Sequence, residues 1–574
     1  MAVAAHNTWH LIKSAQGLKG IVDYVTRSHA RAVMFLIVVA LLNILPGFFS
    51  IPPTDRDEAR FAQATKQMIE TGDFIDIRFQ ETTRYKKPVG IYWLQAAAVK
   101  AGQWLGVPDA LTTISLYRIP SLLGAIGAVL LTYWTALAFV ARRAAVLAAL
   151  MMATCVLIAV EGRLAKTDAC LLLTAVAVMG AMARAYLPDQ RARLAGMPAL
   201  AVPAIFWTAL AAAVLLKGPL VPMFIVLTVG TLVAIDRSAR WLLALRPLPG
   251  LVWLAVLVLP WFLAITMSAG NDFFAESIGQ DLLSKLFQGQ ESHGAPPGYY
   301  FVLFWVTFWP GAVLAGLAAP AIFAARGEPG AKFLLAWIVP CWIVFEIVVT
   351  KLPHYVLPLY PAIAILIAGA VDARLLVSKP WLERGTIWWF AFPTLLGIVG
   401  IVALIVIARR FGLLAWLLIG AAVVMGFRAW QLYRSDGAEH AILRGAVAAL
   451  LIQAAILGVI VPSSSALFPS ATLAKVMRDS GCSAPVAAAA GYHEPSLVFL
   501  AGTATRLTDG AGAAEFLRGG ECRFAFIESR HERSFAQRAD ALGLRYSSGP
   551  RFDVINVGGG GRRTIAVYRS GDSL

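Results

Sequence analysis

The chain contains few charged residues for its length. Of its 574 residues, 14% are charged and 59% are hydrophobic, whereas about 25% charged residues are typical of a soluble domain. This shortage excludes an ordinary soluble protein and predicts a polytopic membrane protein. The net charge is +16, but the basic residues are spread over short loops between apolar runs. That distribution favours orientation in a membrane over nucleic-acid binding.

Cysteine is also scarce, with five in the chain. Cys155, Cys170 and Cys341 lie in apolar runs and are expected to be packing residues. Cys482 and Cys522 lie in a hydrophilic tail and could pair if that tail faces an oxidising compartment. No His/Cys spacing defines a metal site. We therefore expect no tightly bound cofactor, and the sequence leaves open whether a divalent metal ion takes part.

A cleavable signal is not evident, because the first thirty residues are polar and basic and lack a short apolar core. The chain instead has about thirteen apolar runs of the length that crosses a bilayer, about 20 residues. Basic residues follow alternate runs, which places the N-terminus in the cytoplasm and the C-terminal tail on the outer face. The predicted spans are 32–50, 114–140, 143–162, 168–186, 198–216, 219–236, 249–269, 299–324, 331–350, 355–373, 386–408, 413–433 and 441–463.

Two domains follow from this pattern. Residues 1–463 form the transmembrane domain, with a first outer loop at 51–113 and an outer loop at 270–298 that could cover a substrate cavity. Residues 464–574 form a small soluble α/β domain. Its expected helices are 472–479 and 535–544, and its expected strands are 497–500, 523–527 and 564–569.

The first outer loop carries an unusual concentration of charge for a site at membrane level. Asp57 and Glu58 are the leading catalytic candidates, because carboxylates at an interface can act as a base or hold a cation; Asp55 is a weaker candidate. The alternative is a charge pair at a helix N-terminus. Apolar residues from Phe61 to Ile69 recur at helical spacing, and Gly72 suits a helix C-cap, which predicts a short amphipathic helix.

Further basic and aromatic groups lie in the same loop and in the other outer loops. Lys86, Lys87 and Arg60, with Tyr85 beside them, could bind a phosphate, although snorkelling would also explain the cations. Asp168 begins a span, where an unpaired charge is costly, so Arg163 or Lys166 is its expected partner. The remaining candidates lie at span ends or in outer loops and are Lys217, Lys351, Tyr355, Glu276 and His293; a lone histidine is more often a surface or packing residue than a ligand.

Taken in order, these residues form a motif set. It comprises Asp57-Glu58-x-Arg60-Phe61-Ala62, Gly72-Asp73-Phe74, Lys87-Pro88-x-x-x-Tyr92-Trp93, Arg118-x-Pro120-Ser121, Asp168, Lys217-Gly218 and Lys351-Leu352-Pro353-x-Tyr355. The set resembles the bacterial protein O-mannosyltransferase-like, type-C glycosyltransferases, and within them most closely the lipid A 4-amino-4-deoxy-L-arabinose transferases. Phe61, where tyrosine is usual, and Thr82-Thr83-Arg84 before the lysines depart from the pattern and leave the donor sugar open.

The resemblance implies a type-C glycosyltransferase fold and an active site on the periplasmic face of a Gram-negative inner membrane. It implies transfer of 4-amino-4-deoxy-L-arabinose from undecaprenyl phosphate to lipid A phosphates, which confers polymyxin resistance. Asp57 would be the principal acidic residue and Lys87 the donor-phosphate contact, with Asp168, Glu276 and Tyr355 in support. Two alternatives remain: a related transferase with another sugar or a protein acceptor, and a lipid-sugar flippase. Flippases and transporters tend to carry charges at the membrane midplane, whereas the charges here lie at one face.

Overall fold

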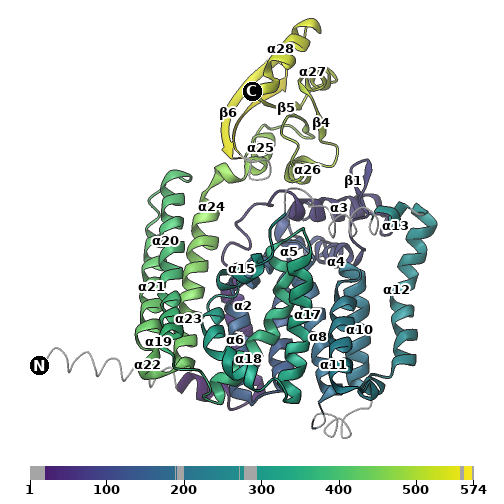
Figure 1. Ribbon diagram of the computed structural model, residues 1–574. Helices are drawn as coiled ribbons and strands as arrows, with labels where there is room; N and C mark the ends of the chain where they lie inside the picture. Colours follow the sequence, from purple (N-terminus) through teal and green to yellow (C-terminus); the bar gives the residue numbers. More distant parts are fainter. Residues whose placement is uncertain are drawn as a thin grey trace, which may run out of the picture.

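The protein consists of a membrane-embedded helical bundle and a small α/β domain that stands on one end of it (Figure 1). The computed structural model describes residues 20–187, 189, 200–270, 272–276, 294–555 and 561–571. The predicted fold class, a polytopic helical membrane protein with a C-terminal α/β domain, is confirmed.

Within the described residues, eight helical segments are long and apolar enough to cross a membrane. Some are single helices, and others join a helix to a short 3-10 or π segment. They are α5 (Ile114–Ala136), α8 (Asp168–Tyr186), α12 (Pro247–Ala269), α17 (Pro329–Ile347), η4 with α18 (Pro353–Asp372), α19 with η5 and α20 (Pro380–Val406), α21 (Leu413–Gln431), and α23 with η6 and α24 (Ala438–Ser463).

The other predicted spans coincide with shorter or broken helices. α15 (Tyr299–Thr307) continues through η3 (Gly311–Leu314) into α16 (Ala315–Ala324) after a bend of 116°. The range 143–162 is divided at Cys155 into two helices. The remaining helices of the bundle are α2 (His29–Ile44), α6 (Arg142–Thr154), α7 (Val156–Glu161), α10 (Ala201–Lys217) and α11 (Leu220–Asp236), followed by η1 (Arg240–Leu245) and, beside the last span pair, α22 (Tyr433–Asp436).

Helices α5 and α8 pack closely at the centre of the bundle. At Gly124 of α5, an added Cβ would lie 2.8 Å from the backbone nitrogen of Cys170 on α8. Only glycine permits this approach without displacing backbone. The close packing brings the first turn of α5, which carries Arg118, near the first turn of α8, which begins at Asp168.

A layer of short elements lies across the end of the bundle, between it and the C-terminal domain (Figure 1). It contains α3 (Asp57–Thr71), β1 (Arg78–Phe79), β2 (Thr82–Thr83), α4 (Gly90–Trp104) and, farther along the chain, α13 (Asp272–Phe274). The predicted amphipathic helix is confirmed as α3, which buries Phe61, Ala64 and Met68. Gly72 is its C-cap, in the left-handed conformation at φ 76° that glycine adopts readily.

The C-terminal domain is built on a five-stranded mixed sheet of order β4-β3-β5-β7-β6. Helices α27 and α28 pack on one face, and α25 and α26 pack on the other. The elements are η7 (Ser465–Leu467), α25 (Pro469–Arg478), β3 (Val486–Ala490), α26 (Pro495–Ala501), β4 (Arg506–Thr508), α27 (Gly510–Arg518), β5 (Arg523–Glu528), η8 (Ser529–His531), α28 (Glu532–Ala541), β6 (Tyr546–Ile555) and β7 (Arg562–Ser570).

One predicted element of this domain is wrong. Residues 497–500 belong to helix α26 and are not a strand. A short apolar run fits either a buried strand or a buried helix, and periodicity alone does not separate the two. Here Pro495 begins the helix, and α26 packs against α3 of the layer below.

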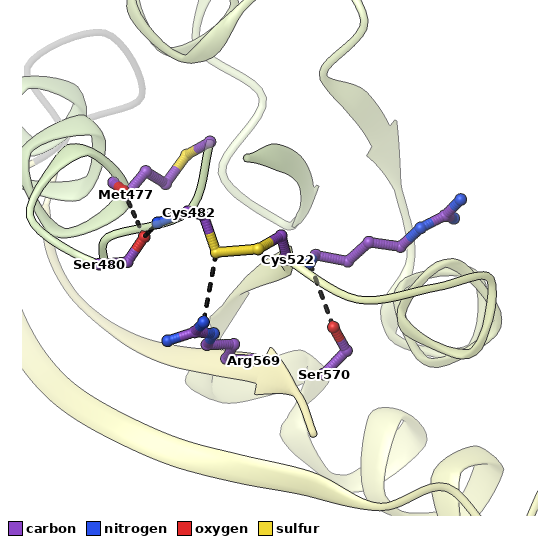
Figure 2. Close-up of a disulfide and its surroundings, with 7 residues drawn as sticks. Met477, Ser480, Cys482, Cys522, Arg569 and Ser570 are labelled. Atoms are coloured by element: carbon purple, nitrogen blue, oxygen red, sulfur yellow. Dashed lines mark hydrogen bonds between the residues drawn. A yellow bond between two sulfur atoms is a disulfide. The ribbon is translucent and has the colours of Figure 1, made fainter. Parts of the chain in front are cut away.

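Cys482 and Cys522 form a disulfide in this domain (Figure 2). The bond joins the segment after α25 to the residue before β5, with Cα atoms 5.8 Å apart. Arg569 of the neighbouring strand β7 donates to the Cys482 sulfur at 3.2 Å (Figure 2). Closing a long loop in this way stabilises the fold chiefly by restricting the unfolded chain.

Candidate functional site

Five charged or ionisable side chains gather at the end of the bundle nearest the C-terminal domain. They are Asp168 at the start of α8, Lys217 at the end of α10, Glu161 at the end of α7, Lys166 between α7 and α8, and His354 in η4. Lys217 Nζ lies 2.5 Å from Asp168 Oδ1, and Lys166 Nζ lies 3.0 Å from Glu161 Oε2 and 3.7 Å from Asp168 Oδ2. We call these five residues the charged cluster.

The charged cluster is balanced in charge. The imidazole of His354 lies 3.5 Å from both Glu161 and Asp168. Ligand atoms of these three residues fall within 4.8 Å of one another, so the set has the composition of a cation site. The same two carboxylates, however, already pair with two lysine ammonium groups. A buried pair of carboxylates that has two such partners does not need a dication to offset its charge.

The structure alters the expected partner of Asp168. Lys166 is near it, as predicted, but Lys217 is closer. Arg163 turns to the end of α2, where it donates to the carbonyl oxygens of Asn43 and Ile44 at 2.7 and 3.1 Å. Its guanidinium therefore holds buried backbone carbonyls, and these contacts do not support its predicted place in the substrate cavity. Lys217 also lies over the Tyr355 ring, 5.5 Å from its centroid, so these two predicted residues do meet.

Asp57 and Lys87 of the first outer loop act electrostatically on the charged cluster. Asp57 is exposed in the first turn of α3. Burial by itself lowers the pKa of Lys166, but Glu161, Asp168 and Asp57 together raise it above its ordinary value. Lys87 is near enough to His354 to act on it electrostatically. The predicted acid and the predicted phosphate contact thus approach the same cluster.

Glu58, although adjacent to Asp57, has a different environment. Its side chain is 1% exposed and pairs with Arg118 of α5, Nε to Oε1, at 2.7 Å. It also accepts from the backbone nitrogens of Thr54 and Ala165, both at 2.9 Å. Burial would raise the pKa of Glu58, but the Arg118 ion pair and these hydrogen bonds lower it. The catalytic role predicted for Glu58 is not supported, since every lone pair available for proton transfer is already engaged.

Asp55 does not face the charged cluster either. Its carboxylate accepts a hydrogen bond from Ser496 of α26, in the C-terminal domain. Burial raises the pKa of Asp55 to about 6, with the Ser496 hydrogen bond acting in the opposite direction and Glu494 adding to the rise. Because Asp55 is bound to Ser496 of α26, its contacts do not support the predicted place in the substrate cavity.

Two further candidates, Lys351 and Tyr85, have structural contacts. Lys351, predicted as a phosphate contact, donates to the carbonyl oxygen of Glu346 at 3.0 Å and to that of Val348, which caps α17. The Tyr85 hydroxyl donates to Asp76 at 2.7 Å, and the Tyr85 ring packs on Phe273. These contacts do not fit the phosphate-binding roles predicted for Lys351 and Tyr85.

The other predicted residues lie around this region. Glu276 accepts from the backbone nitrogen of Tyr85 at 3.2 Å, which ties the start of the second outer loop to the first. Lys86 is exposed before α4, and Arg60 is half-buried on α3. His293, and residues 277–293 of the predicted covering loop, lie outside the described residues.

Glu161, Lys166 and His354 are absent from the predicted site residues, although all three lie in predicted outer loops. His354 occupies the variable position immediately before Tyr355 in the last motif of the set. A sequence signal for these residues exists: Glu161 and Lys166 are ionisable and lie within seven positions of Asp168, and His354 is ionisable and adjoins Tyr355. That signal becomes informative only once α7, α8 and η4 are known to meet.

The protein has the fold of the type-C glycosyltransferases. A solved structure, that of ArnT from Cupriavidus metallidurans bound to undecaprenyl phosphate, matches with a TM-score of 0.71 at 16% identity and covers 94% of this chain and 98% of that chain. The apo structure of the same protein gives a TM-score of 0.70 at 17% identity, covering 93% and 97%.

Curated relatives agree with the resemblance predicted from the motif set, which is confirmed. Three of them are named undecaprenyl phosphate-alpha-4-amino-4-deoxy-L-arabinose arabinosyl transferase. The protein from Edwardsiella ictaluri is 28% identical over 449 residues, covering 75% of this chain and 76% of its own. That from Pectobacterium carotovorum is 28% identical and covers 62% of each chain, and that from Erwinia tasmaniensis is 26% identical and covers 68% and 72%. No protein-family model matches the chain.

Proposed function

We propose that this protein transfers 4-amino-4-deoxy-L-arabinose from undecaprenyl phosphate to a phosphate group of lipid A, and so confers resistance to polymyxin and other cationic peptides. The observation that supports the proposal is that Lys217 contacts both Asp168 and Tyr355, while Asp57 and Lys87 act electrostatically on the same charged cluster. These residues come from segments far apart in the chain, and all belong to the motif set that resembles the arabinosyl transferases.

The donor binds with its prenyl tail in the bilayer and its phosphate at Lys87. In the reaction, the bond between the sugar's anomeric carbon and the donor phosphate oxygen breaks, and undecaprenyl phosphate leaves with the electron pair. Lys87 offsets the negative charge that develops on that oxygen, which is electrostatic stabilisation of the transition state. Arg60, half-buried on the same helix as Asp57, is placed to assist.

The acceptor is a lipid A phosphate, whose oxygen forms the new bond to the anomeric carbon. A phosphate monoester carries about −1.5 to −2 charge at neutral pH and needs little deprotonation. Asp57 therefore acts less as a strong base than as a partner for the ammonium group of the aminosugar and as a positioning group. The Asp168–Lys217 ion pair belongs to the same site.

The test of this function is transfer by the purified protein in detergent or nanodiscs. The substrates are undecaprenyl phosphate-linked aminoarabinose and lipid A, and the product is read by mass spectrometry. The expected result is lipid A that has gained one aminoarabinosyl group. Transfer of the sugar to a protein acceptor, or transfer only from another polyprenyl-linked sugar, would favour a different transferase. Movement of the donor across vesicle membranes without any transfer product would favour a flippase.

The reaction proceeds without a divalent metal ion in this proposal. The support is the charge balance of the cluster, in which Lys166 and Lys217 occupy the positions that a dication would take beside Glu161 and Asp168. The same transfer assay with EDTA present is expected to give an unchanged rate. A loss of rate with EDTA that returns on adding one divalent ion would contradict this part of the proposal.

The site faces the periplasm in the proposed orientation, in the inner membrane of a Gram-negative bacterium with the N-terminus cytoplasmic. The C-terminal domain packs on α3, and Glu58 of α3 accepts from the backbone nitrogen of Ala165, next to Lys166, so the charged cluster lies at the end of the bundle that carries this domain. A disulfide in that domain suits an oxidising compartment. The loops at the opposite end carry the basic residues that favour the cytoplasmic side.

Replacing Lys87 by alanine is expected to lower kcat/KM for the donor about 100-fold, because the leaving phosphate loses its cation. The measurement is initial rate against donor concentration at saturating lipid A. Lys100→Ala is the matched control, since Lys100 lies on the adjacent helix α4 and contacts the Phe74 ring, 4.5 Å from its centroid. An unchanged dependence on donor concentration in the Lys87 variant would remove Lys87 from the donor site.

A further inference from the structure

The C-terminal domain contacts the layer that carries Asp57 through a continuous set of polar and apolar interactions. Lys66 of α3 is buried and donates to the carbonyl oxygen of Phe499 at 3.0 Å. Gln80 donates to the carbonyl oxygens of Thr503 and Thr505 at 2.9 and 2.6 Å. The Phe499 ring packs edge-on against Tyr117 of α5, with centroids 5.2 Å apart. α26 is therefore fixed on α3 and on the bundle together.

One of these interdomain contacts reaches the loop that precedes Asp57. The Ser496 hydroxyl donates to Asp55. Ser496 Oγ also lies 2.6 Å from Ser470 Oγ, which is 2.9 Å from the Tyr492 hydroxyl. Ser470, Tyr492 and Ser496 are each 2% exposed or less, so the chain of hydroxyls is shielded from water. We call Asp55 and these three residues the Asp55 contact.

The residue between Asp55 and Asp57 has an unfavourable backbone conformation. Arg56, the N-cap of α3, has φ 67° and ψ −107°. A non-glycine residue rarely adopts positive φ, and such a conformation persists only where the surroundings impose it. Two anchors do so here. Asp55 on one side is held by the C-terminal domain, and Glu58 on the other side is held by Arg118 and Ala165 of the bundle.

We infer that Ser496 and Asp55 are positioning residues for the transfer reaction: the C-terminal domain, through the Asp55 contact, holds Arg56 in its strained conformation and so aims Asp57 at the charged cluster. This inference rests on the proposed function in that it takes Asp57 as the reacting carboxylate. It gives the C-terminal domain a part in the chemistry through the position of Asp57.

The kinetic test compares variants on both sides of the contact with a control from the same interface. Ser496→Ala and Asp55→Ala each remove the hydrogen bond and are expected to lower kcat by about 10- to 100-fold, since a misplacement of about 1 Å can cost that much. KM for the donor is expected to stay within about twofold, because Lys87 is untouched. Asp55→Asn keeps an acceptor oxygen and is expected to restore at least half of the wild-type kcat.

Thr503→Ala is the matched control. The Thr503 hydroxyl bonds to Gln63 and Glu70 of α3, at 2.9 and 2.6 Å, and makes no contact with Asp55. Loss of the Thr503 hydroxyl weakens the same domain interface, but at contacts that lie about two helical turns or more from Arg56. We expect wild-type kcat for this variant. Equal losses of kcat in Thr503→Ala and Ser496→Ala would mean that the interface is merely structural, and would overturn the inference.

A second readout needs no activity. Hydrogen–deuterium exchange reports the first turn of α3 through the Ala59 and Arg60 amides, which bond to the carbonyl oxygens of Thr54 and Arg56. Exchange of residues 54–60 should be faster in Ser496→Ala than in wild type and unchanged in Thr503→Ala. Unchanged exchange in Ser496→Ala would contradict the positioning role. A wild-type kcat in Ser496→Ala would also contradict it if Asp57→Ala is inactive. Absence of aminoarabinose transfer by the wild type would count against the proposed function alone, and the exchange result would still decide this inference.

Discussion

Replacing Asp57 by alanine is expected to reduce aminoarabinose transfer at least about 1,000-fold while leaving the protein folded. Removing one group that stabilises the transition state typically lowers kcat about 100- to 1,000-fold. The ammonium group of the aminosugar also loses its carboxylate partner in this variant, which adds to the fall. Asp57 is exposed at the first turn of α3, so truncating it removes no buried contact. The measurements are the transfer rate at saturating substrates and the thermal unfolding midpoint in detergent.

Two variants make the Asp57 result specific. Asp57→Asn keeps the size and removes the charge, and should be nearly as inactive as alanine if the ammonium group of the sugar is its partner. Glu81→Ala removes an exposed carboxylate from the turn between β1 and β2 of the same loop and should transfer at the wild-type rate. Full activity of Asp57→Ala would exclude Asp57 from the mechanism.

Replacing the neighbouring residue, Glu58, is expected to have a different effect, because its partner is buried. Glu58→Ala leaves the Arg118 guanidinium, 1% exposed, without its counter-ion. Breaking such a buried pair typically costs about 3–5 kcal/mol. We expect a large fall in the yield of folded protein and in the unfolding midpoint, with activity lost in proportion to folded protein.

The double variant Glu58→Ala/Arg118→Ala separates loss of the pair from loss of a catalytic group. Removing both charges leaves no uncompensated ion, so its unfolding midpoint should lie above that of Glu58→Ala alone. A Glu58→Ala protein that folds normally but does not transfer sugar would restore Glu58 to the catalytic site and contradict the structural role.

Much of the fold could be predicted because its signals are local. Long apolar runs have to cross a bilayer, and the spacing of apolar residues from Phe61 to Met68 with Gly72 after them defines both α3 and its end. The helix at 497–501 was not predictable in the same way. Its apolar run is too short to show a period, and Phe499 makes its decisive contact with Tyr117, which is hundreds of residues away in the chain.

Part of the candidate site was predictable because its motifs are also local in the sequence. Asp57, Lys87, Asp168, Lys217 and Tyr355 follow from the motif set. In the structure Lys217 contacts Asp168 and Tyr355, and Asp57 and Lys87 act electrostatically on the same cluster. The sequence could not show that a carboxylate beside Asp57 turns inward to Arg118 or that Lys351 turns back to cap α17. Side-chain direction at a helix end depends on which neighbours pack there, and those neighbours come from distant segments.

A structure of the protein with undecaprenyl phosphate bound would test the central claim most directly, namely that residues from distant segments form one phospho-sugar site beneath the C-terminal domain. We expect the phosphate to contact Lys87 and to lie beside the Asp168–Lys217 pair and near Asp57, with the prenyl tail extending into the lipid bilayer. The structure also has a polar pocket of about 1,010 Å³ at the opposite end of the bundle, lined by Arg143, Arg374 and Arg434 among others. A phosphate bound there, or at any place away from Lys87, would contradict the account.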